Sequence, residues 1–164
     1  MITAISMGID SPRSTVQICP EPSFGLLPHE LFHCNLTNFP ILEVGEGKTG
    51  NRKVYPFYPE WCELWKLNEG TLPVITGRTN SDLGNRVTQA FKRYGIPFAP
   101  YNLRHAWAIR SMEFGLDVSL SAQQMGHSVK VHTEIYYAWI SDEVHQRAYE
   151  ALINRPNRPR PPQL

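Results

Sequence analysis

Hydrophobic side chains recur at helical intervals through most of the second half of the chain. Residues 81–94 show the clearest stripe, with apolar positions three and four residues apart at Leu83, Val87, Ala90, Phe91 and Tyr94. Ser81 is suited to cap the start of this helix and Gly95 to end it. Weaker patterns of the same kind predict further helices at 23–39, 59–67, 102–114, 118–125, 133–138 and 141–153.

A second pattern, with a period of two, occupies residues 41–58. Apolar and polar positions alternate in Ile41–Val44 and again from Val54 to Tyr58, and the intervening G-K-T-G-N supplies turn chemistry. This predicts a β-hairpin, with Pro56 at an edge or at the end of the ladder. A further short strand or extended link is expected at 72–76. The predicted fold class is therefore α+β, mostly helical, with one small antiparallel sheet.

Proline distribution divides the chain into three parts. Residues 1–22 show no periodicity and are expected to be unstructured or degenerate. Residues 23–153 contain all the predicted elements and form one domain. Residues 154–164 are rich in proline and arginine, which predicts an extended tail.

Composition adds few constraints. The chain has 164 residues, of which 41% are hydrophobic and 19% charged, an ordinary composition for a soluble domain. No run approaches the length of a membrane span, and the N-terminus lacks the pattern of a signal peptide. The three cysteines, Cys19, Cys34 and Cys62, include no C-x-x-C pair, so we expect reduced thiols and a cytoplasmic location.

The formal net charge of +1 does not by itself indicate a nucleic-acid-binding protein. The charge is unevenly distributed, however, since no Asp or Glu occurs from Asn85 to Arg110. The basic candidates for contacts with DNA in this stretch are Arg86, Lys92, Arg93, His105 and Arg110. An ordinary solvated helix face would produce the same pattern.

The most informative stretch is 101–137. Arg104 can hold a phosphate through two parallel hydrogen bonds, His127 can donate another, and Tyr136 can act as a nucleophile. His127 follows Gly126 and lies 23 residues after Arg104, and Tyr136 lies nine residues after His127. These three elements in register resemble the catalytic domain of the tyrosine recombinase (phage integrase) family, with H-x-x-R, then G-H, then the nucleophilic tyrosine. The spacing selects Tyr136 and leaves its neighbour Tyr137 as the expected core aromatic.

The resemblance implies a role for each matching residue. Tyr136 would attack the scissile phosphate of double-stranded DNA and form a 3′-phosphotyrosyl link, while Arg104 and His127 stabilise the charged intermediate. Tyr101 stands at the first position of H-x-x-R, so that the motif reads Y-N-L-R, and it would assist as a hydrogen-bond donor. The family needs neither cofactor nor metal, and helix 141–153 is the expected contact in a homo-oligomer on DNA.

The predicted hairpin also matches the family. Its K-T-G turn, followed by a basic residue and V-x-P, resembles the hairpin that carries a catalytic lysine acting as general acid to the leaving 5′-oxygen. Lys48 is the candidate, with Arg52 and Lys53 as lesser ones.

Two features depart from the family pattern. The family's first catalytic arginine lies in G-L-R-x-x-E-L, whereas this chain reads G-L-L-P-H-E-L over 25–31, so that Leu27 replaces the arginine and Glu30 matches the structural acid. The family's N-terminal DNA-clamping domain has no counterpart in the 22 residues that precede the match. The sequence thus predicts an impaired recombinase, with a non-catalytic DNA-binding relic as the alternative.

A competing motif overlaps this region. Residues 29–33 read H-E-L-F-H, the H-E-x-x-H signature of zinc hydrolases, in which two histidines on one helix face bind zinc and Glu30 would act as general base. The short predicted helix and the lack of a following G-x-x-H disfavour this alternative.

Overall fold

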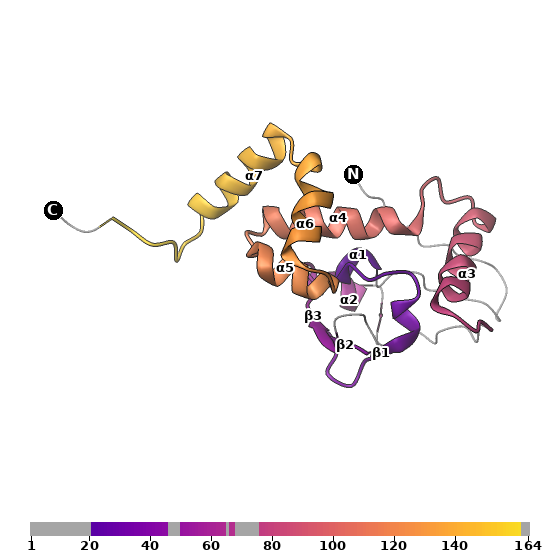
Figure 1. The fold of residues 1–164 in the computed structure, drawn as a ribbon. Coiled ribbons are helices and arrows are strands. Elements are labelled where there is room, and N and C mark those ends of the chain that lie inside the picture. Colours follow the sequence, from indigo (N-terminus) through magenta and orange to yellow (C-terminus); the bar gives the residue numbers. More distant parts are fainter. Residues whose placement is uncertain (1–20, 46–49, 65, 68–75, 162–164) are drawn as a thin grey trace.

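A computed structural model describes residues 21–45, 50–64, 66–67 and 76–161 (Figure 1). In chain order the elements are α1 (Glu21–Phe24), η1 (Glu30–His33), β1 (Cys34–Asn35), β2 (Leu42–Val44), β3 (Arg52–Val54), α2 (Pro59–Leu64), α3 (Asn80–Arg93), α4 (Pro100–Glu113), α5 (Val118–Met125), α6 (Val129–Tyr136), η2 (Tyr137–Trp139) and α7 (Asp142–Ile153). The prediction of a mostly helical α+β fold with one small antiparallel sheet is confirmed.

Helix α4 is the centre of the arrangement. It contacts α1, α3, α5, α6 and α7, and Figure 1 shows α3 near one end of it and α5 and α6 near the other. Trp107, in the middle of α4, is fully buried. Gly25 packs so closely on the Trp107 ring that a Cβ at this glycine would lie 2.7 Å from it. This contact fixes the segment after α1 against the helix that carries Arg104.

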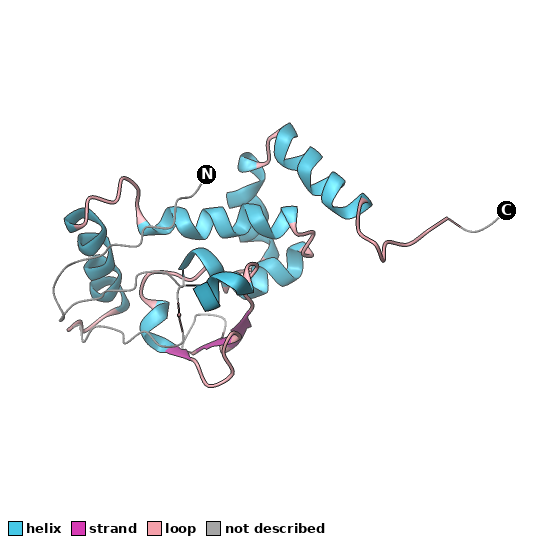
Figure 2. Ribbon diagram, turned by 180° about the vertical axis from the view of Figure 1, so that it is seen from behind, coloured by secondary structure: helices cyan, strands magenta, loops and turns pink. Residues whose placement is uncertain are grey.

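The sheet lies at one edge of the helical body, as Figure 2 shows from behind. Strands β2 and β3 pair antiparallel, with Leu42 opposite Val54 and Val44 opposite Arg52, as expected for a hairpin, but the second strand is Arg52–Val54 and not the expected Val54–Tyr58. Strand β1 pairs with β2 and was not predicted. The inward side chains of β2 and β3 join a core formed by Phe24, Leu26, Leu31, Leu42, Val44, Val54 and Cys62.

Local capping sets several helix boundaries. The N-cap of α3 is Thr79 rather than the predicted Ser81, because Thr79 and Asp82 form a reciprocal capping box. Ser128 and Ser141 cap α6 and α7, and the helix expected to begin at Thr133 starts four residues earlier. Gly126 ends α5 at a φ of 70°, a conformation that glycine adopts without strain.

One expectation for the first half is corrected, and another falls mostly outside the described residues. The single helix expected within 23–39 is two short turns, α1 and η1, separated by residues 25–29. In α2 the buried residue is Cys62, whereas Leu64 is 70% exposed. Most of the strand or link expected at 72–76 lies outside the described residues.

Helix α7 projects from the body, and the chain continues beyond it as an extended segment (Figure 1). It packs on α4 through buried Val144 and through the Arg147–Glu113 ion pair of 2.9 Å. Tyr149, Leu152 and Ile153 of this helix are exposed, although Leu152 also lies close to Gly115 at the end of α4. None of the helices in the described ranges is long and apolar enough to cross a membrane.

Candidate active site

Arg104 lies at the centre of the candidate site. The side chain emerges from α4 and is almost completely buried, at 3% exposure. Its guanidinium donates to the carbonyl oxygen of Gly25 at 2.7 Å and to that of Met125. These bonds join the segment after α1 to the end of α5, so Arg104 positions the turn that precedes His127.

A second buried arginine enters from the sheet. Arg52 on β3 donates from Nη2 to Glu30 Oε2 at 2.7 Å and from Nε to the carbonyl of Gln124 at 2.8 Å. The same Glu30 oxygen lies 3.9 Å from Nη1 of Arg104 and accepts the backbone N–H of Leu27 at 2.8 Å. Glu30 therefore sits between two guanidiniums, consistent with the structural role expected for it.

Tyr136 and two histidines form an aromatic group beside Arg104. The His127 ring stacks on Tyr136 with a centroid distance of 6.2 Å, and His132 contacts both rings, at 5.1 Å from His127 and 4.8 Å from Tyr136. His105 lies edge-on to Tyr136 at 5.4 Å. Tyr136 is 2% exposed and Tyr137 is 73% exposed, so the expectation that Tyr137 is the core aromatic is wrong.

Burial and positive charge govern protonation in this group. Burial, assisted by the charge of Arg104, lowers the pKa of His127 to about 4, so the imidazole is neutral near pH 7. The same two causes lower the pKa of His132. Burial raises the pKa of the Tyr136 phenol, and the charge of Arg104 acts in the opposite direction by favouring the phenolate.

The group contains a concentration of unsatisfied polar atoms. Among the described residues, five buried side-chain atoms here have no hydrogen-bond partner: Nη1 of Arg52, Nε of Arg104, Nε2 of His127, Nδ1 of His132 and Oη of Tyr136. Buried polar groups in folded proteins are normally paired, because an unpaired one costs about 1–3 kcal/mol. The unpaired atoms belong to two arginines, which share the carboxylate of Glu30, and to neutral side chains, a combination that is chemically suited to an anionic ligand.

The other predicted catalytic residues are not among the described members of the buried group around Arg104 and Tyr136. Tyr101 is 40% exposed at the start of α4 and contacts the His105 ring edge-on at 4.7 Å. His105 thus lies next to the aromatic group and not on the outer basic surface expected for it. Lys48 lies outside the described residues. Leu27 is half-buried, and the segment 25–29 that contains it has no arginine.

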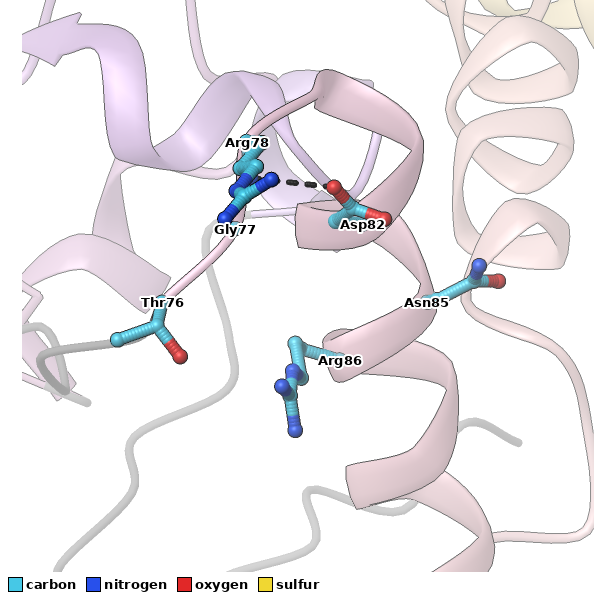
Figure 3. Close-up of a pocket in the computed structure, with 6 residues that line it drawn as sticks. All are labelled: Thr76, Gly77, Arg78, Asp82, Asn85 and Arg86. Atoms are coloured by element: carbon cyan, nitrogen blue, oxygen red, sulfur yellow. Dashed lines mark hydrogen bonds between the residues drawn. The ribbon is translucent and has the colours of Figure 1, made fainter.

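The basic residues expected to contact DNA separate into two groups. Arg86, Lys92 and Arg93 are exposed on α3. Arg86 borders an open recess shared with Arg78, Asp82 and Asn85, where Asp82 accepts the backbone N–H of Arg78 at 3.1 Å (Figure 3). Arg110, by contrast, is buried.

Arg110 is 8% exposed and lies against two aromatic rings, 5.9 Å from the centroid of Tyr58 and 5.5 Å from that of Trp61. A guanidinium in that position stabilises the fold through cation–π contacts and is not displayed to DNA. The expectation that Arg110 belongs to the exposed basic face is therefore corrected.

The H-E-x-x-H segment does not form the geometry of a zinc site. Residues 30–33 make a single 3₁₀ turn, in which positions four apart do not share a face as they do in an α-helix. Glu30 is engaged by Arg52, and His33 Nε2 lies 3.2 Å from Oδ1 of Asn80. The described residues contain no group of three or more His, Cys, Asp or Glu able to hold a metal ion.

Sequence reasoning did not anticipate the positions of two residues. His132 lies four residues before Tyr136 on α6, and this spacing on a helix places both on one face. Arg52 shares the inward face of β3 with Val54, which the period of two could have indicated. In each case the sequence gives the residue type and its local spacing, but not the residues from other elements that it contacts.

Comparison with known proteins places the chain near two excisases. It is 34% identical to excisase C of Nostoc sp. (strain PCC 7120 / SAG 25.82 / UTEX 2576) over 151 residues, which cover 81% of this chain and 30% of that protein. It is 32% identical to excisase A of the same organism over 123 residues, covering 68% of this chain and 26% of the relative. The chain thus spans less than a third of the length of these relatives.

A solved structure gives an independent comparison of the fold. The crystal structure of XerA recombinase superposes with a TM-score of 0.50 and 21% sequence identity, over 82% of this chain and 56% of that one. No protein-family model matches the chain. The chain is accordingly a relative of two excisases with a recombinase-like fold.

Proposed function

We propose that this chain carries the chemistry of a tyrosine recombinase, breaking and rejoining double-stranded DNA through a covalent link to Tyr136. The observation that supports this most directly is the meeting of Arg104, His127 and Tyr136 around a cluster of unpaired buried polar atoms. Their sequence spacing predicted these three residues as a site before their positions were known. The similarity to two excisases points to the same class of reaction.

In the proposed reaction the Tyr136 oxygen attacks the scissile phosphorus. Tyr136 Oη gives up its proton as its bond to phosphorus forms, the bond to the 5′-oxygen breaks, and that oxygen takes up a proton, which leaves a 3′-phosphotyrosyl link and a free 5′-hydroxyl. The phosphate bond is conserved, so the reverse attack by a 5′-hydroxyl reseals a strand without an external energy source. No metal or other cofactor takes part in this step.

The charges of the site match the needs of that step. Arg104 supplies a preorganised guanidinium in a low-dielectric environment, where one such donor contributes about 10²–10³ in rate. His127 is held neutral by its low pKa, and the N–H of a neutral imidazole can donate a hydrogen bond to a non-bridging oxygen without adding charge. Tyr101 would assist as a hydrogen-bond donor, and Lys48 would protonate the leaving 5′-oxygen.

DNA is proposed to approach through the exposed residues Arg86, Lys92 and Arg93 of α3, which place positive charge on the surface. Such contacts with phosphates hold a duplex without reading its sequence. The exposed apolar positions on α7 are the proposed contact with a second copy of the chain on DNA.

Two observations favour a second candidate, a DNA-binding relic without catalysis. Tyr136 is buried at 2% exposure, so its hydroxyl can meet a phosphate only after a local rearrangement. Leu27 also cannot neutralise a phosphate. A chain with these features could retain the fold and the basic surface yet form no covalent link.

A trapping experiment separates the two candidates. The protein is incubated with nicked duplex DNA of randomised sequence, in which the nick lets the cleaved end diffuse away, and denaturing gels then reveal covalent adducts. We expect an adduct from the wild-type chain and from Tyr137→Phe, whose exposed side chain is the matched control, and none from Tyr136→Phe. If the wild type formed no adduct but bound DNA with an affinity that falls steeply as salt rises, the chain would be a DNA-binding relic and not an enzyme.

A further inference from the structure

We propose that Arg52, reaching in from the sheet, supplies the second phosphate-binding guanidinium that residue 27 does not provide. The inference rests on the proposed function, because a DNA phosphodiester is the anion that the two arginines would share. It assigns a binding role to a residue whose visible contacts are an ion pair and a backbone hydrogen bond.

Arg52 has one hydrogen-bond donor without a partner in the part of the chain that the structure describes. Its side chain is 4% exposed, Nη2 and Nε are used by Glu30 and Gln124, and Nη1 is buried with no partner among the described residues. An arginine needed only as an anchor would be expected to satisfy its donors or leave the spare one in water. The spare donor is instead held inside the candidate site.

This unpaired donor, Nη1 of Arg52, lies beside Gly126. A Cβ built on Gly126 would stand 2.9 Å from both Cζ and Nη1 of Arg52, so the guanidinium rests directly on the backbone of the Gly126–His127 turn. Arg104 donates to the carbonyl of Met125, the residue before Gly126. Both guanidiniums therefore contact the turn that presents His127.

The local charge supports the same role. Arg52 and Arg104 share one carboxylate, since Glu30 Oε2 is 2.7 Å from Arg52 and 3.9 Å from Arg104. Among the described residues, these two buried cations share one anion, which leaves one positive charge uncompensated in a region shielded from water. A phosphate bound at the unpaired Nη1 of Arg52 and Nε of Arg104 would supply the missing negative charge.

Leu27, which stands where the family pattern has an arginine, lies close to Arg52. Its backbone N–H donates to the same Glu30 oxygen that Arg52 uses. The guanidinium of Arg52 therefore lies close to the backbone of residue 27, because both donate to one carboxylate oxygen. The charge is supplied from a different element, 25 residues later in the chain.

The test compares four forms of the full chain: wild type, Arg52→Met, the double variant Glu30→Met/Arg52→Met, and Arg147→Met. The double variant removes both ends of the ion pair and so avoids leaving a buried charge unpaired. Arg147→Met removes an arginine that is also ion-paired, to Glu113, but lies on α7 away from the site. Arg52→Lys adds a form that keeps the charge but loses the fork of donors.

Two readouts are taken for each form. The first is the rise in melting temperature caused by inorganic phosphate relative to chloride at equal ionic strength and pH 7. The second is the rate of covalent adduct formation on the nicked DNA. We expect phosphate to stabilise the wild type and Arg147→Met but not the two Met variants at position 52, with Arg52→Lys intermediate, and adduct formation to fall about 10²-fold or more in Arg52→Met.

The outcomes separate this inference from the proposed function. A phosphate effect that depends on Arg52 in a wild-type chain that forms no adduct would support the role of Arg52 and overturn catalysis. A phosphate effect that persists in the double variant, or that is absent from the wild type, would overturn the role of Arg52. Adduct formation at the wild-type rate in folded Arg52→Met would do the same while leaving the enzyme intact.

Discussion

Replacing Glu30 by Gln tests how far one carboxylate holds the two arginines in place. The substitution preserves shape and one acceptor oxygen but removes the negative charge between Arg52 and Arg104. Glu30 is 5% exposed, and the side chains of its two partners are each 4% exposed, so water cannot take over the compensation. The two guanidiniums would then repel one another in a poorly screened environment.

The expected loss of stability follows from the burial of the pair. Removing one partner of a buried ion pair costs about 3–5 kcal/mol, because an uncompensated charge is left behind. Glutamine can still accept hydrogen bonds from Leu27 and Arg52, so we expect the lower end, about 3 kcal/mol. For a chain of this size, 1 kcal/mol shifts the melting temperature by about 2–4 °C, which gives a fall of roughly 6–12 °C.

Thermal and urea unfolding followed by circular dichroism measure this loss. Glu43→Gln is the matched control, because Glu43 forms an exposed ion pair of 3.8 Å with Lys53 on the same sheet. An exposed pair contributes about 0–1 kcal/mol. If Glu30→Gln destabilised the protein no more than Glu43→Gln does, the idea that Glu30 compensates two buried arginines would be refuted.

Three further outcomes are expected. Leu27→Arg should raise the yield of adduct, but by less than the roughly 10²–10³-fold that one missing donor costs, because Arg52 already supplies a cation; a gain of the full size would argue against that role. Gly126→Ala should destabilise the chain more than Gly95→Ala does in urea unfolding: both glycines have a φ near 70°, which costs about 1–2 kcal/mol for a residue with a Cβ, but only Gly126 also abuts Arg52. Equal losses would show that Arg52 moves aside freely. Because the pKa of His127 is about 4 when folded and 6.5 when unfolded, the unfolded chain binds more protons between those values, so the unfolding free energy should fall as pH drops from about 6.5 toward 4. His127→Gln should reduce that slope in urea unfolding, and an unchanged slope would contradict the burial of the imidazole.

The sequence alone determined the local elements and the spacing of the proposed catalytic residues. The stripe over 81–94, the turn chemistry of 41–58 and the cap at Ser141 each depend on residues a few positions apart, so their outcome is largely fixed by nearby side chains. The intervals between Arg104, His127 and Tyr136 are also read directly from the sequence, and their resemblance to the recombinase pattern predicted these residues as one site.

Only the tertiary structure decided which side chains are buried and what they meet. Arg52 bonds to a carbonyl 72 residues away and Arg104 to one 79 residues away, distances along the chain at which no local pattern operates. For the same reason Tyr136 and not Tyr137 enters the interior, and Arg110 lies under aromatic rings instead of on the basic surface. Burial depends on which elements pack together, and that packing gives Arg52 a position in the site that its place in a hairpin did not reveal.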